Sequence, residues 1–397
     1  MTIAVPSGLS AGGADATTNV SNPQTIRNAA TVRQSPRVFC RHNQPQAVVC
    51  NLDMRPLNNS CAERRRGLAL FFLRTGGMTL MHVPVIDIAP FLTDDAGDRR
   101  ALAQKVGQAC RDIGFLIISG HGVDANLIAR TNALSRAFFD LPLGARMAVK
   151  RPALDVTRGE KGFADLNESF MIGPLDVDLA DPYFTAPEAG KHFHPNLWPE
   201  APEGLRETYT AYHRAMGALA AQPMRIFALA LDLPEPFFDA RVDRYISRLR
   251  MRNYPEPLTP PKPGQLRAGA HCDYASLTIL KAEANPGGLQ AFNKAGEWVD
   301  APITPGAYIV NLGESMARWT NDVWVSTLHR VVNPPAEQTA GSRRQSLIFF
   351  HNSNYDAEIA CLSGCVGPDR PPKYAPTTSG GHLRSQFGRT QGAAVIT

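Results

Sequence analysis

Three residues in the second half of the chain have the types and spacing of a metal centre. His271 and Asp273 are two positions apart in the strand-like stretch 271–281, so their side chains are expected on the same face. His329 follows 58 residues after His271 in a second strand-like stretch, 326–332. Two imidazoles and one carboxylate leave three metal positions open, which is typical of mononuclear iron(II) centres that react with dioxygen. We therefore predict that His271, Asp273 and His329 bind iron.

A later strand-like stretch carries a candidate anion site. In the sequence GSRRQSLIFF, alternation places Arg344, Ser346, Ile348 and Phe350 on one face. A guanidinium group that points into a β-core is costly to bury unless it meets an anion. A carboxylate bound in two-pronged fashion by Arg344, with help from the Ser346 hydroxyl, fits that requirement. Arg343 is expected on the other face, paired with a surface acid.

The elements that must position these residues change in type along the chain. Hydrophobic periodicity predicts helices over 98–113, 124–139 and 204–231. It predicts strands over 82–88, 115–119, 248–254, 271–281, 288–292, 307–311, 327–332 and 345–351. Residues 150–200 are rich in proline and are expected to form loops. Helices followed by strands indicate a helical flank that supports a β-barrel or a double-sheet jelly roll.

Composition and charge exclude several classes of protein. Only 19% of residues are charged, but no apolar run reaches the ~18 residues of a membrane span, so a membrane protein is not expected. Residues 1–80 hold nine arginines, no lysine and three acids, whereas the rest of the chain holds 32 basic and 33 acidic residues. The body therefore has no electrostatic signature of nucleic-acid binding. Seven cysteines without paired CxxC motifs indicate neither a disulfide scaffold nor a zinc site, which favours the cytoplasm.

Residues 1–80 have the composition of a disordered N-terminal extension. Three interpretations remain open: an organelle transit peptide, a disordered tail with its own role, or a start codon placed too far upstream. Met78 and Met81 stand just before the first strand signal, and we favour the third interpretation. The remaining chain is expected to divide into a helical flank, 81–245, and a β core, 246–390.

The stretch from His82 to about Thr390 resembles the 2-oxoglutarate/Fe(II)-dependent oxygenase superfamily, in its isopenicillin-N-synthase-like branch. The resemblance rests on six motifs in the family's order: VPVIDIAPF, GFLIISGHGV, RAGAHCDYASLTIL, VNLGESMARWTN, STLHRVVNP and RRQSLIFF. It implies an α+β fold whose core is a double-stranded β-helix (jelly roll) flanked by helices. It also implies Fe(II) as cofactor, 2-oxoglutarate as cosubstrate, and dioxygen and a small molecule as further reactants, with release of succinate and CO2.

The same resemblance assigns roles to individual residues. It implies that iron is held by His271, Asp273 and His329, and that the distal carboxylate of 2-oxoglutarate is bound by Arg344, Ser346 and Tyr254. Where many members of the family have an asparagine near the iron-bound end of the cosubstrate, this chain has Arg252. The stretch 334–342 is expected to be an exposed turn insertion.

Other chemistry remains open at this stage. A 2-oxoglutarate-independent oxidase, an ethylene- and succinate-forming enzyme and a metal-free binding jelly roll are the alternative functions. His192 and His194 form a second HxH pair, but without a suitably spaced third ligand we interpret them as pocket edge or loop packing. Residues 150–200 and 352–390 are expected to line or cover the substrate pocket. The sequence identifies neither the substrate, nor hydroxylation as opposed to desaturation or ring closure, nor an oligomeric state.

Overall fold

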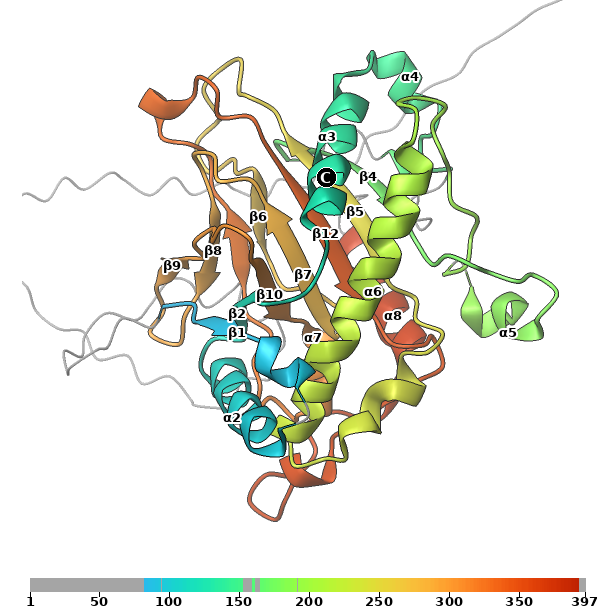
Figure 1. The fold of residues 1–397 in the computed structure, drawn as a ribbon, viewed down its shortest axis with the longest axis vertical. Coiled ribbons are helices and arrows are strands. Elements are labelled where there is room, and N and C mark those ends of the chain that lie inside the picture. Colours follow the sequence, from blue (N-terminus) through green and yellow to red (C-terminus); the bar gives the residue numbers. More distant parts are fainter. Residues whose placement is uncertain (1–81, 94, 153–158, 161–164, 191, 393–397) are drawn as a thin grey trace, which may run out of the picture. The chain divides into compact units, whose positions relative to one another are not determined.

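The computed structural model describes residues 82–93, 95–152, 159–160, 165–190 and 192–392 (Figure 1). The predicted disordered extension, 1–80, lies outside the described residues. Within the described residues the strands form one eight-stranded, one four-stranded and one two-stranded sheet.

The eight-stranded sheet has the order β1-β2-β10-β7-β12-β5-β4-β3. Its strands are β1 (Val85–Asp87), β2 (Phe115–Ser119), β10 (Tyr308–Leu312), β7 (Leu277–Ala282), β12 (Arg344–His351), β5 (Arg248–Tyr254), β4 (Glu168–Ile172) and β3 (Gly159–Glu160). The four-stranded sheet has the order β6-β11-β8-β9, with β6 (Ala268–His271), β11 (His329–Val331), β8 (Leu289–Phe292) and β9 (Trp298–Asp300). Strands β13 (Glu358–Ile359) and β14 (Thr377–Thr378) pair separately.

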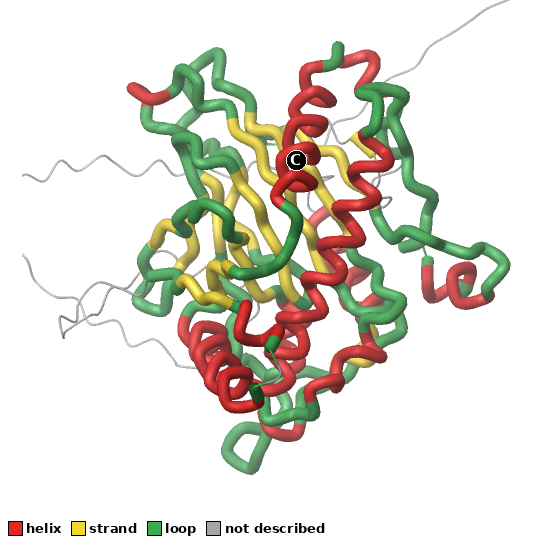
Figure 2. Tube along the Cα trace, in the orientation of Figure 1, coloured by secondary structure: helices red, strands yellow, loops and turns green. Residues whose placement is uncertain are grey.

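Helices cover one face of the large sheet (Figure 2). The α-helices are α2 (Ala96–Asp112), α3 (Ala125–Asp140), α4 (Leu143–Met147), α5 (Pro182–Thr185), α6 (Leu205–Ala230), α7 (Glu314–Trp319) and α8 (Ser379–Gly392). Short 3-10 helices are η1 (Ala89–Leu92), η2 (Pro187–Ala189), η3 (Glu235–Arg241), η4 (Ala336–Gln338) and η5 (Ser363–Cys365). Within the described residues, no helix has the length and apolar character needed to cross a membrane.

Two hydrophobic cores give the fold its three layers. The first joins α2, α3 and α6 to the outer face of the large sheet, where Leu249 and Met251 of β5 are fully buried. The second lies between the two sheets and includes Leu280 and Ile348 from the large sheet and Ala291 from the small one. Burial of each large apolar side chain contributes about 1.5–3 kcal/mol, so these contacts fix the strand faces. The inner face of the large sheet therefore points toward the four-stranded sheet, as in a jelly roll.

Local signals explain where the helices begin and end. The Asp95 carboxylate accepts hydrogen bonds from the backbone N–H groups of Gly97 and Asp98 and caps α2. Asp124 caps α3 in the same way. Gly114, just after the end of α2, has a φ of +66°, and a side chain there would collide with the backbone carbonyl of Val325.

The structure differs from the sequence prediction in several places. The single strand predicted over 271–281 was wrong, because β6 and β7 belong to different sheets and residues 272–276 cross between them. The loop-rich stretch 150–200 contains β4, which is buried along its whole length and extends the large sheet. The segment 81–245 thus supplies strands β1 to β4 as well as helices. The exposed turn predicted over 334–342 is confirmed for 335–338.

Candidate active site

The three predicted metal ligands come together between the two sheets. His271 ends β6, and His329 begins β11 directly opposite it in the antiparallel register. Asp273 lies in the crossing segment that follows β6. One ligand atom from each residue lies within 4.8 Å of the others, and within the described residues these three form the one cluster of this kind.

Backbone hydrogen bonds orient both histidines. Nδ1 of His271 lies 2.8 Å from the carbonyl oxygen of Gly269, and Nδ1 of His329 lies 3.0 Å from that of Thr327. Because a carbonyl only accepts, each Nδ1 carries the proton, and each Nε2 presents a lone pair. Both Nε2 atoms lie 3.8 Å from Oδ1 of Asp273. This is the tautomer and convergence that a divalent metal requires.

The carboxylate of Asp273 is also held by partners that the sequence analysis missed. Its Oδ2 accepts hydrogen bonds from the Thr278 hydroxyl at 2.6 Å and the Asn311 amide at 2.8 Å. Oδ1 therefore remains directed at the histidines. Thr278 of β7 lies between Leu277 and Ile279, whose side chains face the helices. Strand alternation at Thr278 is the signal that would have found this partner.

The surroundings favour an ionised Asp273 and a neutral His271. Burial alone would raise the pKa of Asp273, but His329, His271 and the two hydrogen bonds keep it below its ordinary value. Burial and the neighbouring His329 lower the pKa of His271. A carboxylate and two neutral imidazoles form the donor set that binds a divalent ion.

The predicted carboxylate-binding residues lie on two adjacent strands of the large sheet. Arg344 of β12 pairs with Tyr254 of β5, and the guanidinium carbon of Arg344 lies 5.3 Å from the centre of the Tyr254 ring. Arg344, Ser346 and Tyr254 are each only 2% exposed. Within the described part of the chain, Arg344 Nε and Ser346 Oγ are buried without hydrogen-bond partners. These unsatisfied groups suit an anionic ligand.

Arg343 shows the contrast expected from alternation. It points to the opposite face, where it forms an ion pair with Asp140 and donates to the side chain of Asn253. The surface pairing predicted for Arg343 is confirmed. Leu280 and Ile348, which pair across β7 and β12, form an apolar wall beside Phe350 on the inner face.

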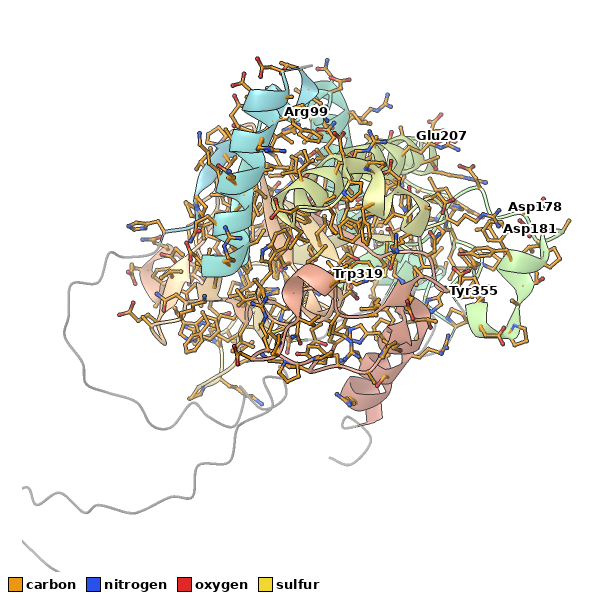
Figure 3. The ribbon with its side chains drawn as sticks, turned by 90° about the horizontal axis from the view of Figure 1, so that it is seen from below. Arg99, Asp178, Asp181, Glu207, Trp319 and Tyr355 are labelled. Carbon is orange, nitrogen blue, oxygen red and sulfur yellow. The ribbon has the colours of Figure 1, made fainter. Side chains whose placement is uncertain are left out.

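The second histidine pair does not form a metal site within the described residues. His192 is buried, and its Nδ1 accepts a hydrogen bond from Arg248 at 3.2 Å. Nδ1 of His194 lies 3.0 Å from the carbonyl oxygen of the neighbouring Pro195. Trp319 is also structural, since its indole N–H donates to the backbone of Glu358 (Figure 3).

The segments predicted to cover the pocket pack against one another. The Asp181 side chain caps α5 (Figure 3). The ring of Tyr183 lies 4.7 Å from the ring of Tyr355. Leu383 of α8 belongs to the same apolar cluster, with Phe387 packed against it. Phe387 also lies 5.9 Å from the ring of Tyr274, the residue after Asp273. The described parts of these two segments therefore meet beside Tyr274, the residue that follows the predicted ligand Asp273.

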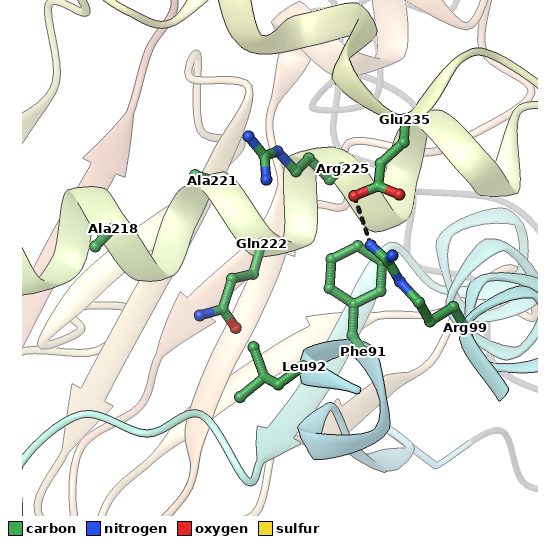
Figure 4. Close-up of a pocket in the computed structure, with 8 residues that line it drawn as sticks. All are labelled: Phe91, Leu92, Arg99, Ala218, Ala221, Gln222, Arg225 and Glu235. Atoms are coloured by element: carbon green, nitrogen blue, oxygen red, sulfur yellow. Dashed lines mark hydrogen bonds and ion pairs between the residues drawn. The ribbon is translucent and has the colours of Figure 1, made fainter. Parts of the chain in front are cut away.

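A separate hollow lies on the helical layer, away from the strands that carry these ligands (Figure 4). Its volume is about 320 Å³, and it lies between η1, α2, α6 and η3. Arg99 and Glu235 form an ion pair at 2.5 Å across it. Residues of this hollow contribute nothing to the His271–Asp273–His329 cluster.

Comparison with known proteins identifies the family. Residues 83–201 match the family described as "non-haem dioxygenase in morphine synthesis N-terminal", and residues 245–353 match the "2OG-Fe(II) oxygenase superfamily". A 2-oxoglutarate-Fe(II) type oxidoreductase of Emericella nidulans, hxnY, is 32% identical over 78% of this chain and 91% of its own length. Validamycin A dioxygenase of Streptomyces hygroscopicus subsp. limoneus is 32% identical over 72% of this chain and 80% of its own length.

Solved structures agree with these relatives. A Neurospora crassa protein crystallised with alpha-KG and thymine has a TM-score of 0.70 at 27% identity and covers 78% of this chain and 97% of its own. The dioxygenase for auxin oxidation of rice has a TM-score of 0.61 at 25% identity, covering 78% and 96%. The relatives favour a 2-oxoglutarate-dependent enzyme over the oxidase, ethylene-forming and metal-free alternatives. The chain belongs to the 2OG-Fe(II) oxygenase superfamily and is an Fe(II)- and 2-oxoglutarate-dependent oxygenase that acts on a small molecule.

Proposed function

We propose that His271, Asp273 and His329 hold the Fe(II) of this oxygenase. The observation that carries the proposal is the convergence of two Nε2 atoms on Oδ1 of Asp273, each at 3.8 Å, with every other polar atom of the three side chains already bonded. Bound iron supplies the chemistry that activates dioxygen and couples it to oxidation of 2-oxoglutarate to succinate and CO2.

We propose further that Arg344, Ser346 and Tyr254 bind the distal carboxylate of 2-oxoglutarate. The partnerless Nε and Oγ atoms of Arg344 and Ser346 support this role, since both would gain a partner. Burial would raise the pKa of Tyr254, but Arg252 and Arg344 keep it below its ordinary value. A phenol beside two cations is a good hydrogen-bond donor to an anion.

The rest of the chain has supporting roles in this proposal. Thr278 and Asn311 fix Asp273, while Leu280, Ile348 and Phe350 exclude water from the reacting centre. Residues 246–390 form the catalytic core and residues 81–245 its flank. Arg252 stands where many members of the family have an asparagine, and it lies beside Tyr254 and opposite Ser346 at the proposed carboxylate site.

We also propose that the enzyme works in the cytoplasm and binds neither nucleic acid nor a membrane. The near balance of acidic and basic residues outside 1–80 supports this. Cell fractionation tests the location, and recovery of the protein in a membrane or organelle fraction would contradict it.

Metal binding tests the ligand assignment. Anaerobic dialysis of the full chain against Fe(II) is expected to give one iron per wild-type chain. His329→Ala should lose that iron, because one of three protein ligands is missing. His194→Ala is the matched control and should bind iron like the wild type, since His194 is not part of the cluster. Equal binding by both variants would refute the assignment.

A further inference from the structure

The inner face of β5 carries a row of three arginines. Arg248, Arg250 and Arg252 alternate along the strand with Leu249, Met251 and Asn253. The odd-numbered side chains face the helices, and Leu249 and Met251 are fully buried there. Alternation therefore places all three guanidinium groups on the face that looks toward the second sheet.

Strand register places this row beside the proposed active site. On the inner face of the large sheet, Tyr254 of β5 pairs with Arg344 of β12. The next two pairs on the same face are Arg252 with Ser346 and Arg250 with Ile348. Arg248 comes next, opposite Phe350, which in turn pairs with Thr278 on β7. Since Thr278 bonds to Asp273, the row runs from the proposed 2-oxoglutarate end toward the metal ligands.

Within the part of the chain that the structure describes, the direct contacts of these arginines are with uncharged groups. Arg248 donates to Nδ1 of His192 and lies 5.2 Å from the ring centre of Phe387. Arg252 adjoins Tyr254. Arg250 lies 5.1 Å from the ring centre of Phe350, and within the described residues it forms no ion pair and its buried Nε has no hydrogen-bond partner.

Within the described residues, no carboxylate outside the proposed metal site is available to neutralise Arg250. Burial, and then repulsion from Arg252, lowers the pKa of Arg250 to about 9, so the group is still charged at neutral pH. Asp273 is the acid that acts on it, but that charge belongs to the metal site. The negative charges of Asp273 and of one carboxylate of 2-oxoglutarate neutralise the two positive charges of a divalent ion. The positive charge of Arg344 neutralises the second carboxylate. The β5 arginines therefore keep excess positive charge that favours a further anion.

We propose that the substrate oxidised by this enzyme is a small organic acid whose carboxylate is bound by Arg250. This inference rests on the proposed function, because the same interior holds the metal and 2-oxoglutarate. A guanidinium fork binds a carboxylate through two parallel hydrogen bonds and fixes its direction. Arg248 adds positive charge at the next inward position, and Phe350 and Phe387 offer apolar surface to the body of the acid. Arg250 is thus the residue that selects acids over their neutral analogues.

Stability of the ligand-free protein gives the first test. Replacing a half-buried charge that forms no ion pair within the described residues is not expected to destabilise the fold, so Arg250→Gln should unfold at the wild-type temperature or above it. Arg146→Gln is the matched control, because Arg146 is buried in an ion pair with Glu168 and its loss strands that acid. Arg146→Gln should unfold at a clearly lower temperature. An equal loss in Arg250→Gln would show that Arg250 has a structural partner and would overturn the proposal.

Binding of simple acids gives the second test. The full chain is loaded with Mn(II), a redox-inert substitute for iron, and 2-oxoglutarate, and its thermal unfolding is followed with acetate, benzoate, phenylacetate, their amides and phenyl phosphate. At least one carboxylate should raise the unfolding temperature above its amide. Its affinity should fall about 10- to 100-fold in Arg250→Gln, the effect of losing a charge-assisted pair. The proposal is overturned if no acid raises the unfolding temperature more than its amide does. It is also overturned if phenyl phosphate is the one compound that binds, or if Arg250→Gln binds the acids as tightly as the wild type.

Titration with 2-oxoglutarate separates this inference from the proposed function. Arg250→Gln should bind Mn(II) and 2-oxoglutarate like the wild type, whereas Arg344→Gln should lose 2-oxoglutarate. If Arg250→Gln loses 2-oxoglutarate instead, Arg250 belongs to the cosubstrate site and the organic-acid proposal fails. If the wild type binds neither metal nor 2-oxoglutarate, the proposed function itself fails.

Discussion

Replacement of Thr278 by valine tests whether the hydrogen bonds behind Asp273 prepare the metal site. Oδ2 of Asp273 accepts two hydrogen bonds, from Thr278 at 2.6 Å and Asn311 at 2.8 Å. Valine keeps the shape and strand preference of threonine but removes one of the two donors. A hydrogen bond to a charged group contributes about 1.5–3 kcal/mol, which corresponds to about 10- to 100-fold in affinity. The same range is found for outer partners of metal ligands.

The assay is anaerobic Fe(II) dialysis, with urea unfolding of the metal-free protein measured in parallel. Thr131→Val is the matched control, because Thr131 is fully buried and donates to the backbone of Leu127 at 2.7 Å within α3. Thr278→Val should bind iron about 10- to 100-fold more weakly, and Thr131→Val should bind it normally. Wild-type affinity in Thr278→Val, or an equal loss in both variants, would refute the reasoning.

Three further predictions concern the cosubstrate, pH and stability. Arg344→Gln should raise the KM for 2-oxoglutarate about 10- to 100-fold in a succinate assay, while the outward-facing Arg343→Gln should leave it unchanged; equal effects would contradict the assignment. Burial and His213 lower the pKa of His351 to about 3, below the ~6.5 of the unfolded chain, so the folded state binds fewer protons between these values. The contribution of His351 to the free energy of unfolding should be fully present above about pH 6.5 and should fall below that pH by up to about 1.4 kcal/mol per pH unit. Urea unfolding at about pH 7.5 and pH 5 measures this fall, and His351→Gln should make it smaller. An unchanged fall in His351→Gln would contradict this. Arg146→Gln should lower the free energy of unfolding by about 3–5 kcal/mol, and adding Glu168→Gln should recover part of the loss; additive losses would argue against the buried pair.

Residues on regular strands were predictable from the sequence. Alternation in β12 placed Arg344 and Ser346 inward and Arg343 outward, because a buried sheet fixes the face of every side chain. The pairing of His329 with His271 depends on β6 and β11 being neighbours, which the spacing of 58 residues alone does not determine. The family motifs supplied that connection.

The residues that were missed depend on tertiary contacts. The crossing segment 272–276 has the pattern of a continuing strand, and only the two-sheet architecture bends it. β4 contains Glu168, and an acidic residue argues against a buried strand. In the structure its charge is neutralised by Arg146, 22 residues away in the sequence. Asn311 reaches Asp273 from a strand 38 residues further along the chain. No local periodicity encodes such pairings, so their detection required the fold.

The most direct test of the account is formation of succinate from 2-oxoglutarate by the Fe(II)-loaded full chain in the presence of dioxygen. Wild type and His194→Ala are expected to release succinate slowly even without added substrate. Asp273→Ala should release none above the metal-free background, because its iron site lacks the carboxylate. Equal succinate from Asp273→Ala and wild type, or none from a wild type shown to bind iron and 2-oxoglutarate, would contradict the account.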